Sequence, residues 1–303
     1  MKTITQEQSL AKPPQLSIYI LFILLILVWG LGWPVIKTSI NYCPPCWCVT
    51  FRVIIAFLAI TIYLICTKQL RLPKLIDIPL LCSVGLLQIA LYILLVNVGL
   101  KYVPPGQSSI LSYSTPLIVT PIACIWFKEQ LTPLKLIGLF LGLCGILLLF
   151  SPWAINWHNH EMLLGNGLLL LAAFSSATAM LHMRFTTWHS TALQLLPWQL
   201  LIAAIPTFIF SWIIDPHPVI IINESFIACL AYLGLIATIF GYWASMQITK
   251  ALPVSTTSVC LLAVPVTSLL SSMIFLGERL TLTVFIAFML ILGGLICVIF
   301  PKK

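Results

Sequence analysis

Long apolar runs, separated by short polar or Pro/Gly/Asn-rich breaks, make up most of this sequence. A helix needs about 20 mostly apolar residues to cross a hydrocarbon core about 30 Å thick. Because the runs are continuous and do not alternate with polar residues, they exclude a porin-type barrel and favour helices. The predicted membrane-spanning helices cover residues 18–38, 45–66, 78–98, 104–127, 133–152, 162–183, 192–214, 225–248, 253–276 and 281–300. The pattern therefore predicts an all-α integral membrane protein with ten transmembrane helices.

An internal repeat relates two distant parts of the chain. When residues 101–152 are laid over residues 250–301 without a gap, many polar, proline and glycine residues coincide. The matched pairs include Lys101 with Lys250, Pro104 with Pro253, Pro116 with Pro265, Glu129 with Glu278, and Gly145 with Gly294. This offset of 149 residues spans five predicted helices, an odd number, so the second copy must enter the membrane from the opposite side. Inverted repeats are typical of secondary transporters with a site near the midplane, although a duplication without a transport role also fits.

The repeat sets the domain organisation. We expect a cytoplasmic N-terminal tail over residues 1–17, a first five-helix repeat over 18–152 and a second over 162–300. The first apolar run is too long for the apolar segment of a signal peptide, and no small-residue cleavage site follows it, so we interpret it as the first span. The predicted fold is thus ten transmembrane helices arranged as two inverted five-helix repeats.

Composition and charge support a lipid environment. Of the 303 residues, 61% are hydrophobic and 7% are charged, whereas a soluble domain carries about 25% charged residues. A water-soluble enzyme, a nucleic-acid-binding protein and a disordered chain are therefore excluded, and the lipid bilayer is an expected partner. With the N-terminus inside, every Lys and Arg except Lys37, Arg52, Lys101 and Arg279 falls in an inner segment. The positive-inside rule then predicts that both termini are cytoplasmic and accounts for the net charge of +8 without nucleic acid.

Several segments resemble one transporter family. The stretch Trp29-Gly30-Leu31-Gly32-Trp33-Pro34-Val35-Ile36-Lys37 is similar to the WG…K signature in the first helix of EamA-type proteins of the drug/metabolite transporter (DMT) superfamily. Phe51-Arg52, followed by Ala56-Phe57-Leu58-Ala59, resembles the second-helix pattern of that family. The runs 128–132 and 277–281 resemble its repeated GE-x-L-T segment, with Lys128 in place of the first glycine. The resemblance covers nearly the whole chain as two five-helix halves.

This resemblance implies a multi-pass carrier in the bacterial inner (plasma) membrane, and not an enzyme. It implies a central cavity lined mainly by the first, third, fourth, sixth, eighth and ninth helices. Proteins of this type are often exporters of amino acids or other small metabolites. We therefore expect a secondary transporter, an exporter or exchanger of a small metabolite such as an amino acid or a related solute with a carboxylate, that works by alternating access around a midplane cavity.

Polar and aromatic residues inside the spans are the candidates for a substrate site, because such groups normally face the interior of a helix bundle. The predicted substrate-binding residues are Trp29, Trp33, Gln88, Tyr92, Ser109, Tyr113, Tyr232 and Trp243. Prolines at corresponding positions of two repeats also indicate a transporter's site. The predicted helix bends, which would act in gating, are at Pro34, Pro116 and Pro265. For each of these residues, interhelical hydrogen bonding or ordinary packing is the alternative.

Two basic residues near the predicted cavity have two interpretations. Arg52 lies within the second span and is either a gate or site cation or a structural anchor. Lys37 lies closer to its helix end, where a long basic side chain reaches the headgroups cheaply. Because basic residues exceed acidic ones near the cavity, a substrate with a carboxylate is favoured. No Asp or Glu lies well inside a predicted span, so the coupling ion, the direction of transport and an exchange mode all stay open.

The predicted outer loop Cys43-Pro44-Pro45-Cys46-Trp47-Cys48 supports a hypothesis from another class. A dithiol near a helix N-terminus can be redox-active, so an integral-membrane redox protein using Cys43 and Cys46 is one alternative. A disulfide among these cysteines and a non-transporting scaffold or sensor are also left open. No cofactor and no metal site are predicted, since no P-loop or dinucleotide fingerprint occurs and the few histidines lack metal-ligand spacing. Nothing in the sequence indicates the oligomeric state.

Overall fold

The structure is a computed structural model of the whole chain. It describes residues 15–115, 118–119, 122, 125–126, 132–150, 160–253, 256–257, 260–277 and 282–299. Five residues named in the sequence analysis lie outside these ranges: Pro116, Lys128, Glu129, Glu278 and Arg279.

All regular structure in the described residues is helical. The first part of the chain forms α1 (Gln15–Ser39), α2 (Pro45–Cys66), η1 (Leu75–Asp77), α3 (Ile78–Cys82), η2 (Ser83–Leu91), α4 (Tyr92–Tyr102), α5 (Pro105–Ser112) and α7 (Pro133–Phe150). The second part forms α8 (His160–Phe185), α9 (Ala192–Ile214), α10 (Glu224–Ala231), η3 (Tyr232–Phe240), α11 (Gly241–Ala251), α13 (Ala263–Leu276) and α14 (Leu282–Ile299). The segments η2 and η3 are π-helical and lie inside otherwise continuous helices.

Six helical segments in the described residues are long and apolar enough to cross a membrane. They are Ser17–Ser39, Pro45–Cys66, Leu75–Tyr102, His160–Phe185, Ala192–Ile214 and Glu224–Ala251. Two shorter apolar helices cover Leu136–Gly145 and Ala263–Leu276. The bounds of α2 and α9 confirm the spans predicted at 45–66 and 192–214. The all-helical, apolar architecture is that of a multi-pass membrane protein.

Local sequence accounts for several helix ends. Proline stands at the start of α2 and α5, where its missing N–H costs no hydrogen bond. Thr191 and Gln194 form a reciprocal capping box at the start of α9. The side chain of Asn223 accepts a hydrogen bond from the Phe226 backbone N–H at 2.8 Å and caps α10. Gly277 ends α13 with a φ of 69°, a left-handed conformation that glycine adopts without strain.

Helix bounds recur along the chain at the offset found in the sequence. The bounds of η2 and η3 differ by 149 residues at both ends, and so do those of α4 and α11 and those of α7 and α14. A π-helical turn places i→i+5 hydrogen bonds within an α-helix and is often found at functional sites. The span that contains η2 and the span that contains η3 therefore both change from α-helical to π-helical geometry, at positions 149 residues apart.

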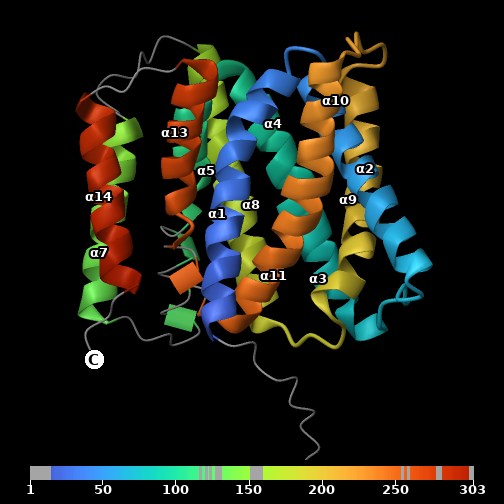
Figure 1. Cartoon of the computed structure of the whole chain (residues 1–303), viewed down its shortest axis with the longest axis horizontal. Coiled ribbons are helices and arrows are strands. Elements are labelled where there is room, and N and C mark those ends of the chain that lie inside the picture. The colour runs from blue at the N-terminus through green and yellow to red at the C-terminus, as the bar shows by residue number, and fades with distance from the viewer. Residues whose placement is uncertain are drawn as a thin grey trace, which may run out of the picture.

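The two parts of the chain interlock. Helix α1 packs against α13 and α11, α2 against α9, α4 against α8, and α7 against α14. Figure 1 shows α1 in the middle of the bundle, and α7 and α14 side by side at one edge. The largest apolar core joins residues of α1, α4, α8, α11 and α13. Each of these pairings joins one helix of the first part to one of the second, so the interior lies largely between the parts.

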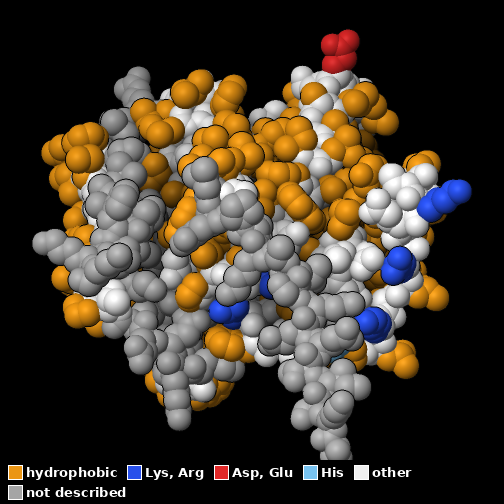
Figure 2. Space-filling view, turned by 60° about the horizontal axis from the view of Figure 1, so that its bottom comes forward, with side chains coloured by type: hydrophobic (Ala, Val, Ile, Leu, Met, Phe, Trp, Pro, Cys, Tyr) orange, Lys and Arg blue, Asp and Glu red, His pale blue; other side chains and the backbone are white. Residues whose placement is uncertain are grey.

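The surface is largely apolar, and the mainly apolar interior also holds many polar groups. Large apolar side chains such as Phe140 (66% exposed) and Ile213 (70% exposed) point outward. Buried polar residues, mostly Ser and Thr, line the helix contacts. Among the coloured side chains in Figure 2, hydrophobic ones are the most abundant, Lys and Arg side chains lie in the middle and at the right of the view, and an acidic side chain lies at the top. Such a surface is suited to lipid.

Candidate functional site

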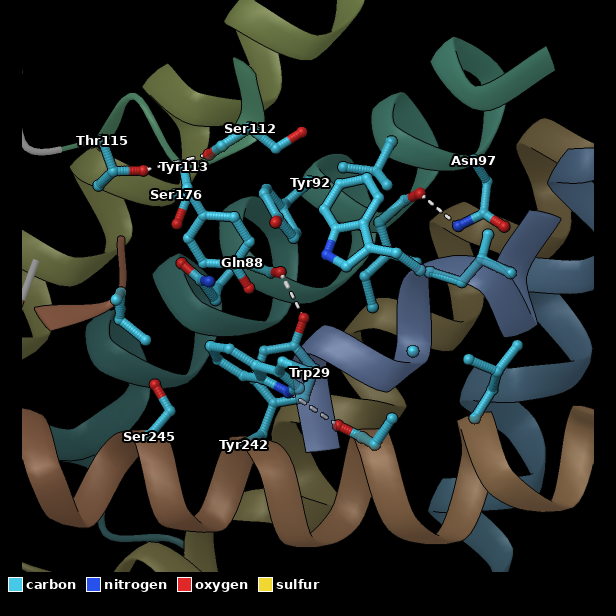
Figure 3. A pocket seen from close by; sticks show the side chains of 18 of the residues that line it. Trp29, Gln88, Tyr92, Asn97, Ser112, Tyr113, Thr115, Ser176, Tyr242 and Ser245 are labelled. Atoms are coloured by element: carbon cyan, nitrogen blue, oxygen red, sulfur yellow. Dashed lines mark hydrogen bonds between the residues drawn. The ribbon is translucent and has the colours of Figure 1, made fainter. Parts of the chain in front are cut away.

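A cavity lies in the interior between the two parts of the chain (Figure 3). Its volume is about 780 Å³ when all space not filled by atoms is counted, including space open to solvent. The lining residues are Trp29, Gly32, Trp33, Ile36, Arg52, Gln88, Tyr92, Ile93, Val96, Asn97, Ser112, Tyr113, Thr115, Ser176, Met180, Met183, Leu233, Ala237, Tyr242, Ser245 and Leu261. An apolar and aromatic wall with a few polar groups is typical of small-molecule sites.

The lining residues come from the helices that the family resemblance implies around the cavity. Lining residues come from α1, from η2 and α4, from α5 and the residues after it, from α8, from η3 and α11, and from the segment before α13. These correspond to the first, third, fourth, sixth, eighth and ninth predicted spans. Arg52 of α2 is an addition to that set.

Aromatic rings form two contacts on the wall. The rings of Trp29 and Tyr242 meet edge to face with centroids 5.9 Å apart, and those of Trp33 and Tyr113 do so at 6.3 Å. Edge-to-face contacts at such distances are favourable because the positive edge of one ring meets the negative face of the other. The wall is therefore shaped by rigid side chains from both parts of the chain.

Two hydrogen bonds cross between the parts at the π-helical segments. The Trp29 indole Nε1–H donates to the Ala237 carbonyl at 3.1 Å, and the Tyr242 hydroxyl donates to the Gln88 carbonyl at 2.9 Å. Figure 3 shows both bonds as dashed lines beside the cavity. Gln88 in η2 and Ala237 in η3 are 149 residues apart, so equivalent carbonyls accept a bond from an aromatic donor of the other part. These bonds hold the two parts together next to the cavity.

Arg52 is the basic residue on the wall. Its side chain is buried, and its Nε–H donates to the Thr238 hydroxyl at 2.7 Å. The lining set contains no Asp or Glu. The other polar groups on the wall are neutral, among them the amides of Gln88 and Asn97 and the hydroxyl of Ser112. Of these, Gln88 Oε1 and Ser112 Oγ have no hydrogen-bond partner in the structure.

The structure brings together five of the eight residues predicted to bind substrate. Trp29, Trp33, Gln88, Tyr92 and Tyr113 line the cavity. The other three, Ser109, Tyr232 and Trp243, do not belong to the lining set.

Local contacts explain why these three residues lie away from the wall. The hydroxyl of Ser109 donates to the Gly106 carbonyl of its own helix at 2.7 Å. The hydroxyl of Tyr232 donates to the Val28 carbonyl at 2.7 Å, and Trp243 packs against Phe240. In this structure each fits the packing or interhelical alternative considered for it.

Two of the predicted bends, Pro34 and Pro265, and the second basic residue, Lys37, do not belong to the lining set. Pro34 is inside α1, and Pro265 is buried in the first turn of α13. Pro116 lies outside the described residues. The Lys37 Nζ donates to the Leu100 carbonyl at 2.7 Å, close to the C-terminal end of α4, where a cation also interacts favourably with the helix dipole.

Sequence reasoning missed Ser176 of α8 and Ser245 of α11, both of which line the cavity. The sequence does contain an indication of polar groups in this helix, since the pair Ser175-Ser176 interrupts the apolar run of the sixth predicted span. Ser175 is not on the wall, because its hydroxyl donates to the Leu87 carbonyl at 2.7 Å. Which serine of the pair faces the cavity depends on helix rotation, which an almost wholly apolar helix does not reveal.

The cysteines at the start of α2 form a buried cluster. Cys43, Cys46 and Cys48 are each at most 5% exposed, and all three are free thiols in the structure. The Cys48 thiol donates to the Cys43 carbonyl at 3.3 Å. A hydrogen bond with the Cys48 side chain, together with burial, raises the pKa of the Cys43 thiol. A reactive dithiol requires the opposite shift, because the thiolate is the nucleophile.

Comparisons with known proteins agree with this geometry. The sequence matches the EamA-like transporter family over residues 16–151 and 163–300, which together make up nearly the whole chain. The chain belongs to the EamA-like transporter family. This membership confirms the resemblance drawn from the motifs, and relatives in the family are transporters and not enzymes.

Relatives of this EamA protein include named transporters. A probable amino-acid metabolite efflux pump of Escherichia coli (strain K12) is 30% identical over 299 residues, covering 94% of this chain and 95% of the relative. The uncharacterized transporter YvbV of Bacillus subtilis (strain 168) is 26% identical, covering 96% and 93%. A solved crystal structure matches with a TM-score of 0.76 over 94% of this chain and 99% of that chain. At 20% sequence identity, that match supports the fold alone.

Proposed function

We propose that this EamA-family protein is a secondary transporter that exports or exchanges a small metabolite by alternating access around the interior cavity. The observation that carries the proposal is the cavity itself, enclosed between two interlocking parts of the chain and lined by aromatic and neutral polar side chains. A site between repeated halves near the midplane is where secondary transporters bind their substrates. The absence of a P-loop in the sequence fits a carrier that does not hydrolyse ATP.

The proposed architecture is ten transmembrane helices in two inverted five-helix repeats, over residues 18–152 and 162–300. Six long spans, two shorter apolar helices and the recurrence of helix bounds at an offset of 149 support it. In the proposed mechanism the two repeats rock against each other, and the Trp29–Ala237 and Tyr242–Gln88 bonds break and reform as the cavity opens to alternate sides. Pro34, Pro116 and Pro265 are the proposed bending points.

The proposed location is the bacterial inner membrane, with both termini in the cytoplasm. Lys68, Arg71 and Lys74 follow α2, and Arg184 and Lys250 stand near the ends of α8 and α11. The Arg184 guanidinium donates to the Lys250 carbonyl at 3.0 Å, so the ends of α8 and α11 lie together. Gathering of basic residues at one end of the bundle supports a cytoplasmic assignment for that end.

The proposed substrate class is a small metabolite that carries a carboxylate, such as an amino acid. The size of the cavity, the basic residue on its wall and the lack of acidic lining residues support this choice. The name of the Escherichia coli relative, a probable amino-acid metabolite efflux pump, points to the same class of solute.

Transport by the purified protein in proteoliposomes tests the proposal. Vesicles loaded with one unlabelled amino acid are expected to take up the same labelled amino acid by exchange, for at least one member of a panel of the twenty proteinogenic amino acids. Trp33→Ala removes an aromatic side chain from the wall and is expected to lower the rate about tenfold, equivalent to about 1.4 kcal/mol. Trp212→Ala is the matched control, because Trp212 is 55% exposed on the outer surface.

Two outcomes would count against transport as proposed. No exchange of any panel member by folded protein would favour a non-transporting scaffold or sensor. Loss of exchange on replacing both Cys43 and Cys46 by Ser, with an unchanged melting temperature, would favour the redox alternative. Unchanged exchange in that double variant is expected, since both thiols are buried away from the cavity wall.

A further inference from the structure

Arg52 is a buried cation for which the described residues offer no anion. Its side chain is 7% exposed and borders the cavity. The ion pair found within the described ranges joins His189 and Asp77, and no carboxylate there pairs with Arg52. Removing a charge from water costs several kcal/mol unless a partner compensates it. An anion that enters from the cavity would therefore lower the free-energy cost of burying this guanidinium.

The Arg52 side chain is held in place by a short chain of hydrogen bonds. Its Nε–H donates to the Thr238 hydroxyl at 2.7 Å, and that hydroxyl donates to the Leu233 carbonyl at 2.7 Å. Both Thr238 and Leu233 belong to η3, so a π-helical segment of the second part orients a cation of the first part. A guanidinium has five N–H donors, and Thr238 accounts for one. The remaining donors have the planar geometry that matches a carboxylate.

The surroundings of Arg52 are polar but neutral. The side chains of Tyr92, Tyr113 and Tyr242 line the same cavity. Phenol hydroxyls orient their dipoles around a cation, which lowers the cost of burying it, but they do not neutralise it. On the same wall, Gln88 Oε1 accepts no hydrogen bond in the structure. A buried acceptor without a donor is costly, so the wall that carries the cation also carries an acceptor for an N–H group.

We infer that Arg52 binds the carboxylate of the transported solute and that Gln88 accepts a hydrogen bond from its ammonium group. This inference rests on the proposed function and names the recognition groups of the same cavity. The ligand class is an α-amino acid or a close derivative. The aromatic faces of Trp29, Trp33 and Tyr242 supply further attraction for an ammonium group. A purely structural anchor would bond to carbonyls of a helix end, whereas the Arg52 Nε–H is bonded to the side chain of Thr238, which lies inside η3.

Ligand-dependent thermal stability tests the inference. Each of the twenty proteinogenic amino acids is compared with its carboxamide, which keeps the side chain and the amino group but loses the carboxylate. A ligand stabilises the state that binds it by mass action, so the concentration dependence of the melting temperature yields an affinity. For the wild-type protein, at least one acid is expected to bind at least about thirtyfold more tightly than its amide.

Three variants, one of them a control, test which residues cause the preference for the acid over its amide. Arg52→Gln is expected to reduce the acid-over-amide ratio to about one while leaving amide binding in place, which also demonstrates that the variant is folded. Arg184→Gln, the same substitution at the end of α8, is the control and should keep the wild-type ratio. Gln88→Leu is expected to weaken the acid but not the deaminated analogue of that acid, because only the acid carries the ammonium group.

The inference is overturned if no acid stabilises the wild-type protein, if amides bind as tightly as acids, or if Arg52→Gln keeps the preference. These results differ from failure of the proposed function. A protein that exchanges amides or uncharged metabolites across liposomes without any preference for acids would still be a transporter, and Arg52 would then not be its carboxylate site.

Discussion

Gly241 shows at the scale of one residue how the two parts of the chain fit together. It is the first residue of α11, directly after the π-helical segment, and the indole of Trp29 lies against it. A Cβ at this position would overlap Trp29 Nε1, the atom that donates to Ala237. The absence of a side chain at Gly241 therefore permits the hydrogen bond between the parts.

We predict that Gly241→Ala destabilises the protein by about 1–3 kcal/mol, because overpacking displaces the Trp29 ring. Within a helix, Ala is normally about 1 kcal/mol better than Gly, so the expected sign is the reverse of the intrinsic preference. Gly167→Ala in α8 is the matched control, since a Cβ there meets no atom within 4 Å. Thermal unfolding in detergent should place Gly241→Ala below the wild type and Gly167→Ala at or above it. The opposite order would contradict the packing described for Trp29.

Individual residues also show which parts of the candidate site could be predicted from the sequence. Arg52 and Gln88 were predicted as interior residues because strongly polar groups are rare in spans, and both line the cavity. Ser109 and Ser176 could not be assigned in the same way. A serine can satisfy its own hydroxyl on the backbone of its helix, as Ser109 does with Gly106, so its presence in a span does not imply a role in a site.

At the scale of helices, the pair α7 and α14 depends on close backbone contact. A Cβ at Gly294 would lie 2.5 Å from the Gly138 carbonyl oxygen and 3.0 Å from the Gly142 backbone nitrogen. Small residues at helix contacts let backbones approach in membranes, where the hydrophobic effect does not drive helices together. The spacing of Gly138 and Gly142 gives α7 a complementary surface for Gly294.

The neighbouring glycine makes this contact testable. We predict that Gly294→Ala separates α7 from α14 and lowers stability by about 1–3 kcal/mol. Gly293→Ala should have little effect, because the nearest atom to a Cβ there is Leu141 Cδ1 at 4.0 Å. Crosslinking between cysteines introduced on the two helices, measured together with the melting temperature, would separate these outcomes. Equal effects of the two substitutions would mean that Gly294 does not lie at the helix contact.

The helices themselves were largely predictable and their irregularities were not. Long apolar runs bounded by polar or Pro/Gly/Asn-rich breaks located α2 and α9 to the residue. The repeated identities at an offset of 149 anticipated the recurring bounds of α7 and α14, while the inversion of the repeats stays a proposal. The π-helical segments η2 and η3 were not predicted from the sequence; in the structure a carbonyl of each accepts a hydrogen bond from an aromatic side chain distant in sequence, Tyr242 for η2 and Trp29 for η3.

At the scale of the whole molecule, the apolar exterior and the nearly uncharged interior both follow from the scarcity of charged residues. Only 7% of the residues are charged. Those in the described residues gather mainly at helix ends, and Arg52 is the charged residue of the cavity wall. A charge distribution of this kind sets the orientation in the membrane and leaves the cavity with a positive character.

The proposed orientation predicts which side of the membrane exposes Cys66. This cysteine ends α2, is exposed, and precedes the basic residues Lys68, Arg71 and Lys74, so it should lie on the cytoplasmic side. A membrane-impermeant maleimide is expected to label it in inside-out vesicles but not in intact spheroplasts. The Cys66→Ser variant shows how much of the maleimide labelling comes from Cys66, because labelling that persists in this variant comes from other thiols. The buried thiols Cys43, Cys46 and Cys48 should react only after unfolding. Labelling of Cys66 in intact spheroplasts would reverse the topology, and with it the assignment of both termini to the cytoplasm.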